Sequence, residues 1–249
     1  MIYKKSPEEL EVMRQGGRIL VDTLNALEEA LRPGVTTADL DRIAEQRISD
    51  AGARPSFKGY RGFPGSICAS PNQVIVHGIP GPTTLHDGDI ISLDVGVLWQ
   101  GFHVDSAWTF PVGEIAAEAR DLLKVTEASL DAAIEQCRPG NRLGDVGHAV
   151  EQVALAAGFS IVREYVGHGV GRALHEDPQI PNYGPPGRRQ ALAPGMTLAI
   201  EPMINLGGER TKVLGDAWTV ETLDGSLSAH FEHTVAITEE GHEVLTRRS

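Results

Sequence analysis

The sequence has few cysteines, few basic residues and no long apolar run. Its only two cysteines, Cys68 and Cys137, exclude a disulfide framework and are typical of a reducing compartment. Lys and Arg together number 22 against 34 Asp and Glu, which makes the formal net charge -12. This acidic balance argues against a broad contact with nucleic acid or an anionic membrane, and we expect neither as a partner.

Segments that direct a chain into a membrane are missing as well. No stretch approaches 18 consecutive apolar residues, so no membrane-spanning helix is predicted. Residues Met1–Ser6 lead into a polar helical segment without an apolar core, so no signal peptide is predicted either. Together with the cysteine usage, these features predict a cytoplasmic protein.

The composition of the 249 residues is that of an ordinary globular protein, with 41% hydrophobic and 22% charged residues. A chain of this length buries roughly 70–75% of its unfolded surface when it folds as one large domain. We therefore expect residues 1–249 to form a single domain.

An internal repeat runs through this domain. Arg32–Gly34 recurs as Arg138–Gly140, and Ala51-Gly52 recurs as Ala157-Gly158, each 106 residues later. The common order and spacing indicate two structurally equivalent halves related by pseudo-twofold symmetry. The halves are expected at about residues 7–112 and 113–249.

Each half is predicted to contain two helices followed by antiparallel strands. Ser6-Pro7 and Glu9 form a capping box at the start of the first helix, and Pro33-Gly34 ends it. Helices in pairs followed by strands indicate an α+β fold, with one curved antiparallel sheet and the helices on its outer face. The predicted helices are 7–32, 37–51, 115–137 and 142–157, and the predicted strands are 67–69, 73–76, 90–98, 103–110, 160–165, 197–205, 217–221 and 231–237.

Two acidic residues interrupt strands that are otherwise apolar. Asp94 lies inside strand 90–98, although aspartate is depleted in strands and a buried charge is costly unless it is paired or metal-bound. A two-residue turn at Trp99-Gln100 would make Asp94 and Asp105 direct cross-strand neighbours. One of two adjacent carboxylates stays protonated at neutral pH unless a cation lies between them. The alternative is a strand face open to water, where charges cost little.

The second half contributes counterparts to these carboxylates. The repeat aligns Glu201 with Asp94, and Glu232 enters another apolar strand, although either alone could be a strand-end residue facing solvent. His168 lies among the glycines of Gly167–Gly171, whose spacing differs from that of a phosphate-binding loop. Four carboxylates and one imidazole suit divalent metals, and two such ions would neutralise about four negative charges. We expect a two-metal centre that activates water for hydrolysis.

These residues and their order strongly resemble the pita-bread metallopeptidases, and within them the type I methionine aminopeptidases. The short interval between Glu201 and Glu232 is similar to type I, because type II members carry an insertion there. The resemblance covers essentially the whole chain. The strings that support it are Val76–Pro80, Asp87–Asp94, Gly167–Gly171, Glu201–Met203 and Phe231–Thr234.

The resemblance implies a role for each polar residue. Asp94 would chelate one metal and His168 with Glu201 the other, while Asp105 and Glu232 would bridge the two. Glu201 would also accept and shuttle a proton. The metals would be cobalt, manganese, iron or zinc, and the sequence does not distinguish among them.

Two further histidines and an apolar slot are implied at the same centre. His175 would stabilise the oxyanion, and His77 would hydrogen-bond the scissile amide or its leaving nitrogen. Leu174 stands where relatives often have an aromatic residue, which affects the shape of the slot. The residues expected to line the methionine pocket are Tyr60, Phe63, Cys68, Tyr165 and Trp218, and each of them could instead be ordinary core packing.

The expected function is removal of the initiator methionine from nascent polypeptides when the second residue is small. The expected partners are the N-termini of nascent chains and, transiently, the ribosome, and the chain is expected to be a monomer. Two alternatives remain open from the sequence. One is an Xaa-Pro peptidase of the same fold, and the other is a metal-free relative that only binds partners, although that relative would lack some of the five ligands.

Overall fold

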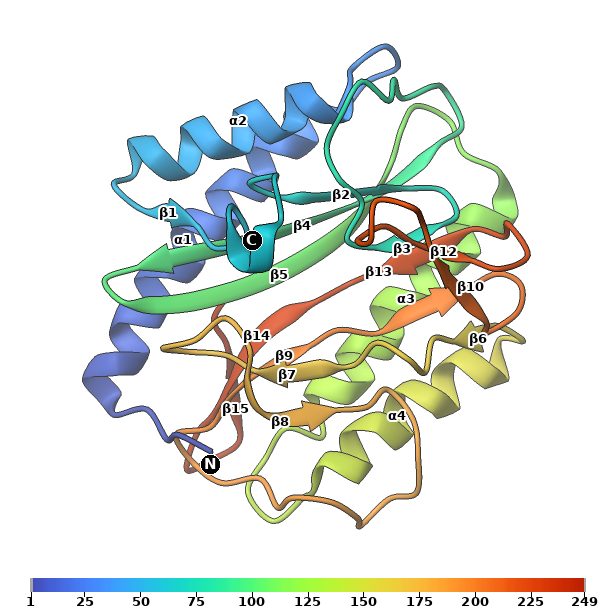
Figure 1. The fold of residues 1–249 in the computed structure, drawn as a ribbon. Helices are drawn as coiled ribbons and strands as arrows, with labels where there is room; N and C mark the ends of the chain where they lie inside the picture. The colour runs from blue at the N-terminus through green and yellow to red at the C-terminus, as the bar shows by residue number, and fades with distance from the viewer. Residues whose placement is uncertain (1, 249) are drawn as a thin grey trace.

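The computed structural model describes residues 2–248 (Figure 1). Its four α-helices are those predicted, with ends that differ by at most three residues: α1 (Pro7–Ala30), α2 (Thr37–Asp50), α3 (Ala117–Ile134) and α4 (Leu143–Ala156). The strands are β1 (Arg54–Pro55), β2 (Cys68–Pro71), β3 (Val74–Val76), β4 (Ile90–Trp99), β5 (Phe102–Pro111), β6 (Ser160–Ile161), β7 (Gly167–Gly169), β8 (Glu176–Ile180), β9 (Thr197–Ile200), β10 (Met203–Asn205), β11 (Thr211–Val213), β12 (Val220–Thr222), β13 (Ser228–His230), β14 (His233–Ile237) and β15 (His242–Val244), with a 3-10 turn η1 (Tyr60–Gly62).

Local hydrogen bonds explain where the helices begin. The Ser6 hydroxyl accepts from the backbone N–H of Glu9, and the Glu9 carboxylate accepts from the N–H of Ser6, which completes the predicted capping box of α1. The second helix of each half starts with the same contact, because Asp39 accepts from the N–H of the residue three positions earlier at 3.0 Å, and Asp145 does so at 2.7 Å.

The strands form four antiparallel sheets rather than the single uninterrupted sheet that the sequence predicted. Their orders are β1-β4-β2 with β5 beside β4, β13-β10-β6, β11-β12-β3, and β15-β14-β9-β7-β8. The predicted strand 197–205 is two strands, because Pro202 has no N–H to donate and interrupts the ladder. The first and last sheets still adjoin, since the N–H of Glu232 donates to the Ala107 carbonyl at 2.8 Å and β14 lies beside β5 in Figure 1. The fold class is confirmed as α+β with helices outside the strands.

The register of the β4–β5 hairpin differs from the prediction. The turn residues are Gln100 and Gly101, both with positive φ, rather than Trp99 and Gln100. Turns of this kind favour glycine at their second position, which is Gly101 here. The prediction placed the turn one residue too early in the chain. As a result Asp94 faces Ala107 across the ladder rather than Asp105. Asp94 and Asp105 still point to the same face, one diagonal step apart, because the shift is an even number of residues.

Two apolar cores lie between the helices and the strands and pack them together. Residues of α1 and α2, among them Leu20 and Leu40, pack with the apolar positions of β4 and β5, and α3 and α4 pack with β9, β10 and β13. Helix α1 approaches the C-terminal segment so closely that a Cβ on Gly17 would lie 2.0 Å from the Leu245 carbonyl oxygen. No helix among residues 2–248 is long and apolar enough to cross a membrane.

Candidate metal centre and adjoining pocket

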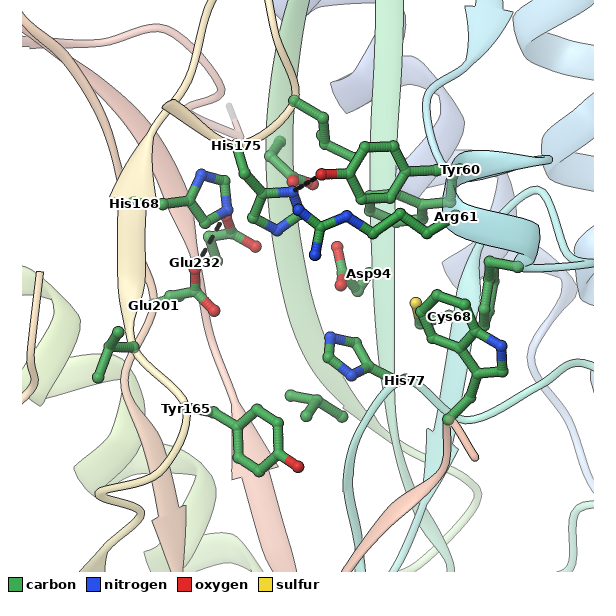
Figure 2. A pocket seen from close by; sticks show the side chains of 17 residues that line it. Tyr60, Arg61, Cys68, His77, Asp94, Tyr165, His168, His175, Glu201 and Glu232 are labelled. Atoms are coloured by element: carbon green, nitrogen blue, oxygen red, sulfur yellow. Dashed lines mark hydrogen bonds and ion pairs between the residues drawn. The ribbon is translucent and has the colours of Figure 1, made fainter. Parts of the chain in front are cut away.

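One pocket contains every polar and apolar residue that the sequence singled out. It opens between the strands of the two halves, and Figure 2 shows the side chains converging on it from both sides. The pocket is also lined by four residues that the sequence did not predict, namely Phe57, Arg61, Val76 and Val166. The predicted residues that line it are Tyr60, Phe63, Cys68, His77, Asp94, Asp105, Tyr165, His168, His175, Glu201, Trp218 and Glu232.

The β4–β5 hairpin supplies the first two carboxylates. Asp94 pairs in register with Cys68 of β2, and Asp105 lies opposite Gly96. A side chain at Gly96 would collide with Ser56 and with the Phe57 ring at 2.8 Å, so only glycine fits beside Asp105. Two strands that are buried on both faces therefore hold the two acids in fixed positions.

His168 reaches the same point from the other half because glycines surround it. A Cβ on Gly167 would lie 2.4 Å from the Ala199 carbonyl oxygen, and one on Gly169 would lie 2.2 Å from the carbonyl oxygen of residue 177. These glycines let β7 pack closely between its neighbours. The His168 Nδ1 lies 2.8 Å from the Gly169 carbonyl oxygen, so Nδ1 carries the proton and Nε2 is left as an electron-pair donor.

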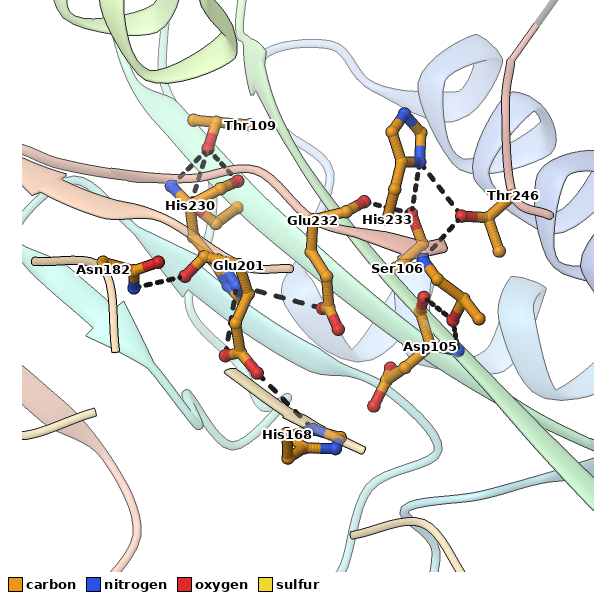
Figure 3. Close-up of polar contacts among 12 residues, drawn as sticks. Asp105, Ser106, Thr109, His168, Asn182, Glu201, His230, Glu232, His233 and Thr246 are labelled. Carbon is orange, nitrogen blue, oxygen red and sulfur yellow. Dashed lines mark hydrogen bonds and ion pairs between the residues drawn. The ribbon is translucent and has the colours of Figure 1, made fainter. Parts of the chain in front are cut away.

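The remaining carboxylates complete a cluster around His168 (Figure 3). Its Nε2 lies 3.4 Å from Glu201 Oε1. Asp105, His168 and Glu232 each present one ligand atom, and these atoms lie within 4.8 Å of one another. The carbonyl oxygen of Glu201 accepts from the Asn182 side-chain amide at 2.9 Å, which fixes the backbone at the end of β9.

His230 also lies at the cluster and was not predicted. Its Nε2 is 3.8 Å from Glu201 Oε2 and 3.9 Å from Glu232 Oε2 (Figure 3). Burial is the main cause that lowers the pKa of His230 to about 3, so the ring is neutral at physiological pH. The only signal in the sequence was its place two residues before Glu232; His230 ends β13, and Glu232 lies between β13 and β14.

Burial dominates the electrostatics of the carboxylates. It raises the pKa of Asp94 to about 7, and with the neighbouring acids it raises those of Asp105, Glu201 and Glu232 well above the ordinary range. Buried oxygens of Asp94, Asp105 and Glu232 have no hydrogen-bond partner among the described residues. Such atoms are costly unless a cation binds them, and oxygen atoms with one imidazole nitrogen are ligands that divalent metals accept. The donor set therefore fits a divalent metal centre.

Two histidines lie beside this cluster and are held by aromatic residues. The His175 ring lies 4.1 Å from that of His168 between centroids and contacts the Tyr60 hydroxyl through Nδ1 at 2.9 Å. Burial is the main cause that lowers its pKa to about 3. His77 packs edge-on against Tyr165 and Trp218, and its φ of 59° lies in the left-handed region that non-glycine residues rarely adopt.

An apolar slot continues from the histidines. Phe57, Phe63, Cys68 and Leu174 are buried together, with Trp218 edge-on to Phe63 at 5.2 Å between centroids. Burial raises the pKa of the Cys68 thiol, which stays neutral and acts as a small apolar group. The slot suits an unbranched apolar side chain.

Comparison with known proteins identifies the class of protein that this fold and site define. The sequence model of metallopeptidase family M24 matches residues 11–239, and the chain belongs to that family.

Within the family, the similar proteins are methionine aminopeptidases. Methionine aminopeptidase 1 of Bacillus subtilis is 55% identical over 247 residues, which cover 99% of this chain and all of the relative. The crystal structure of methionine aminopeptidase from Rickettsia prowazekii superposes with a TM-score of 0.98 at 40% identity, over 99% of this chain and all of that one. A prolidase from Pyrococcus furiosus shares the fold alone, with a TM-score of 0.82 at 22% identity over 99% of this chain and 66% of its own.

Proposed function

We propose that this protein is a metal-dependent aminopeptidase that removes the N-terminal methionine of nascent polypeptides when the second residue is small. The observation that carries the proposal is the cluster of buried carboxylates, three of which have an oxygen without a hydrogen-bond partner among the described residues, in the same pocket as an apolar slot. The relatives that cover the full chain are named methionine aminopeptidases, which supports the same substrate.

We propose that five residues would hold two divalent ions: Asp94 would bind one, His168 and Glu201 would bind the other, and Asp105 and Glu232 would contribute to both. The unpartnered oxygens and the deprotonated His168 Nε2 support this assignment. The identity of the ions is open among cobalt, manganese, iron and zinc. When bound, such ions would make a hydroxide available at neutral pH and would polarise the scissile carbonyl.

The protein's own groups then orient the substrate and move protons. Glu201 accepts a proton from water and delivers it to the leaving amine, which its position between His168 and His230 allows. His175 stays neutral, and because Tyr60 occupies its Nδ1, its Nε2 is left to stabilise the oxyanion. His77 contacts the scissile amide. The α-amine of the substrate lies near Asp94, which limits cleavage to the first residue.

The slot supplies the preference for methionine. An unbranched thioether fits between Phe63 and Cys68, and its sulfur gains contacts with the rings of Tyr60, Tyr165 and Trp218. The second residue of the substrate would lie beside His77 and His175, which line the same pocket, and we expect a small side chain to fit there best. The proposed setting is the cytoplasm, where a monomer acts on N-termini as they leave the ribosome and contacts the ribosome transiently.

The test compares three peptides with metal-loaded protein. We expect release of methionine from Met-Ala-Ser, much slower release from Met-Leu-Ser, and no cleavage of Gly-Pro. An intact Met-Ala-Ser would contradict the proposed substrate, and cleavage of Gly-Pro in its place would favour an Xaa-Pro peptidase.

A further inference from the structure

Arg61 is a cation at the pocket that none of the proposed steps uses. It lines the pocket, its side chain is exposed at the mouth, and its guanidinium lies over the Tyr60 ring at 5.3 Å from the centroid. Figure 2 shows it beside Tyr60 and His175. Among residues 2–248 it forms no ion pair with a carboxylate. Five other arginines of the chain pair with acids, namely Arg14, Arg42, Arg163, Arg172 and Arg248, but among the described arginines Arg61 is the unpaired one that lines the pocket.

The local backbone holds Arg61 in this place. Its φ of 49° and ψ of 24° are left-handed, a conformation that costs a non-glycine residue free energy. The flanking Gly59 and Gly62 also have positive φ, and the N–H of Gly59 donates to the Phe63 carbonyl at 2.8 Å, which closes the turn. Strain of this kind persists where the surrounding structure enforces it, and it is concentrated at sites that bind ligands.

The direction in which the peptide binds determines which residue of the substrate lies next to the Arg61 guanidinium. If the proposed function holds, the α-amine lies at the carboxylates and the methionine side chain fills the slot, so the rest of the peptide passes His175 and leaves through the mouth. Tyr60 stacks on His175 at 5.3 Å between centroids, and Arg61 lies on Tyr60, which places the guanidinium one side chain further out. An extended residue advances about 3.4 Å, so the third residue is the one that reaches this position.

We propose that Arg61 is a specificity-determining residue that binds an acidic side chain at the third position of the substrate. This inference rests on the proposed aminopeptidase function. A guanidinium without a carboxylate partner offers paired N–H donors that match a carboxylate in geometry and charge. A lysine at the same substrate position would instead be repelled. The protein as a whole is acidic, with a formal net charge of -12, so Arg61 is a positive charge that an incoming acidic side chain can pair with on an otherwise acidic protein.

The solvent exposure of Arg61 sets how strongly the protein should prefer an acidic residue at the third position of the substrate. An ion pair at an exposed mouth gives about a three- to fivefold gain in kcat/KM for a third-position glutamate over glutamine. Because salt screens exposed charges, the gain should shrink toward onefold in about 0.5 M sodium chloride.

The experiment measures methionine release from Met-Ala-Glu-Ser, Met-Ala-Gln-Ser and Met-Ala-Lys-Ser. All three peptides carry a C-terminal amide, which removes the terminal carboxylate as a competing anion. The variants are Arg61→Asn, because asparagine tolerates the left-handed backbone, and Arg61→Lys, which keeps the charge. Arg32→Asn is the matched control, since Arg32 is exposed on another part of the chain and its loss changes the net charge equally.

We expect the wild-type protein, Arg32→Asn and Arg61→Lys to prefer glutamate, and Arg61→Asn to lose the preference. Equal rates on the three peptides with wild-type protein would overturn the inference alone, and so would a salt-independent preference or one that Arg61→Asn retains. The salt series needs no variant, so the test stands even where a substitution prevents folding. If wild-type protein released no methionine from any of the peptides, the proposed function would fail and the inference would fail with it.

Discussion

The ion pair between Lys5 and Glu176 is expected to be a large contributor to stability. The Lys5 Nζ lies 2.6 Å from Glu176 Oε2, and the two side chains are only 3% and 6% exposed. The other carboxylate oxygen accepts from the N–H of Ala173, and the Lys5 backbone N–H donates to the Gly195 carbonyl at 2.7 Å. The pair therefore ties the N-terminal segment to the loop that ends at His175.

Lys5→Met would leave the Glu176 carboxylate buried without its counter-ion. Removing one partner of a buried pair costs about 3–5 kcal/mol. For a domain of this size each kcal/mol lowers Tm by about 2–4 °C, so we expect a fall of about 6–20 °C. Thermal and urea unfolding of metal-free protein would measure it, because bound metal adds stability of its own.

A double variant separates the lost ion pair from lost packing. Lys5→Met combined with Glu176→Gln removes both charges and keeps an acceptor for the N–H of Ala173. We expect it to recover most of the stability that Lys5→Met loses. If Lys5→Met alone cost less than about 1 kcal/mol, the pair would behave as a solvated surface pair, and the reasoning from its burial would be wrong.

Two further predictions concern the carboxylate cluster. Glu201→Gln should lower kcat by at least about 10²-fold while the circular dichroism spectrum is unchanged, because the proton acceptor is lost; full activity would refute the role given to Glu201. In metal-free protein, burial raises the pKa of Asp94 to about 7 and holds those of Asp105, Glu201 and Glu232 well above their ordinary range, so near pH 7 the folded state holds carboxyl protons that the unfolded state has released. Stability should therefore fall as pH rises from about 7.5, where the histidines are largely neutral in both the folded and the unfolded state; a Tm in chelator that rises from about pH 7.5 to 8.5 would contradict this.

The sequence predicted which residues line one pocket more closely than it predicted the strands around them. Asp94, Asp105 and Glu232 were recognisable because an acid inside an apolar strand is costly, and that cost exists in any register. The hairpin register was misplaced by two residues, yet Asp94 and Asp105 stayed on one face because side chains alternate along a strand. An odd shift would have separated them.

The features that the sequence did not predict depend on contacts between distant segments. Short strands such as β7 and β15 carry too few residues for alternation to be visible, and they exist because neighbouring strands supply hydrogen-bond partners. The places of His230 and Arg61 at the site are set by their distances to Glu201 and Tyr60, which local sequence patterns do not give. The helices were predicted closely because caps and apolar periodicity are local signals. The equivalence of the two halves stays a prediction.

A metal titration of chelated protein tests directly whether the converging carboxylates act by holding metal ions. Bound ions per chain and methionine release from Met-Ala-Ser are measured together. We expect an inactive protein at the start and activity that rises as manganese, cobalt, iron or zinc binds, up to two ions per chain. We also expect Asp105→Asn to bind less metal, because one of the unpartnered buried oxygens is replaced. Full activity in the fully chelated protein would contradict the claim that the converging carboxylates act by holding metal ions.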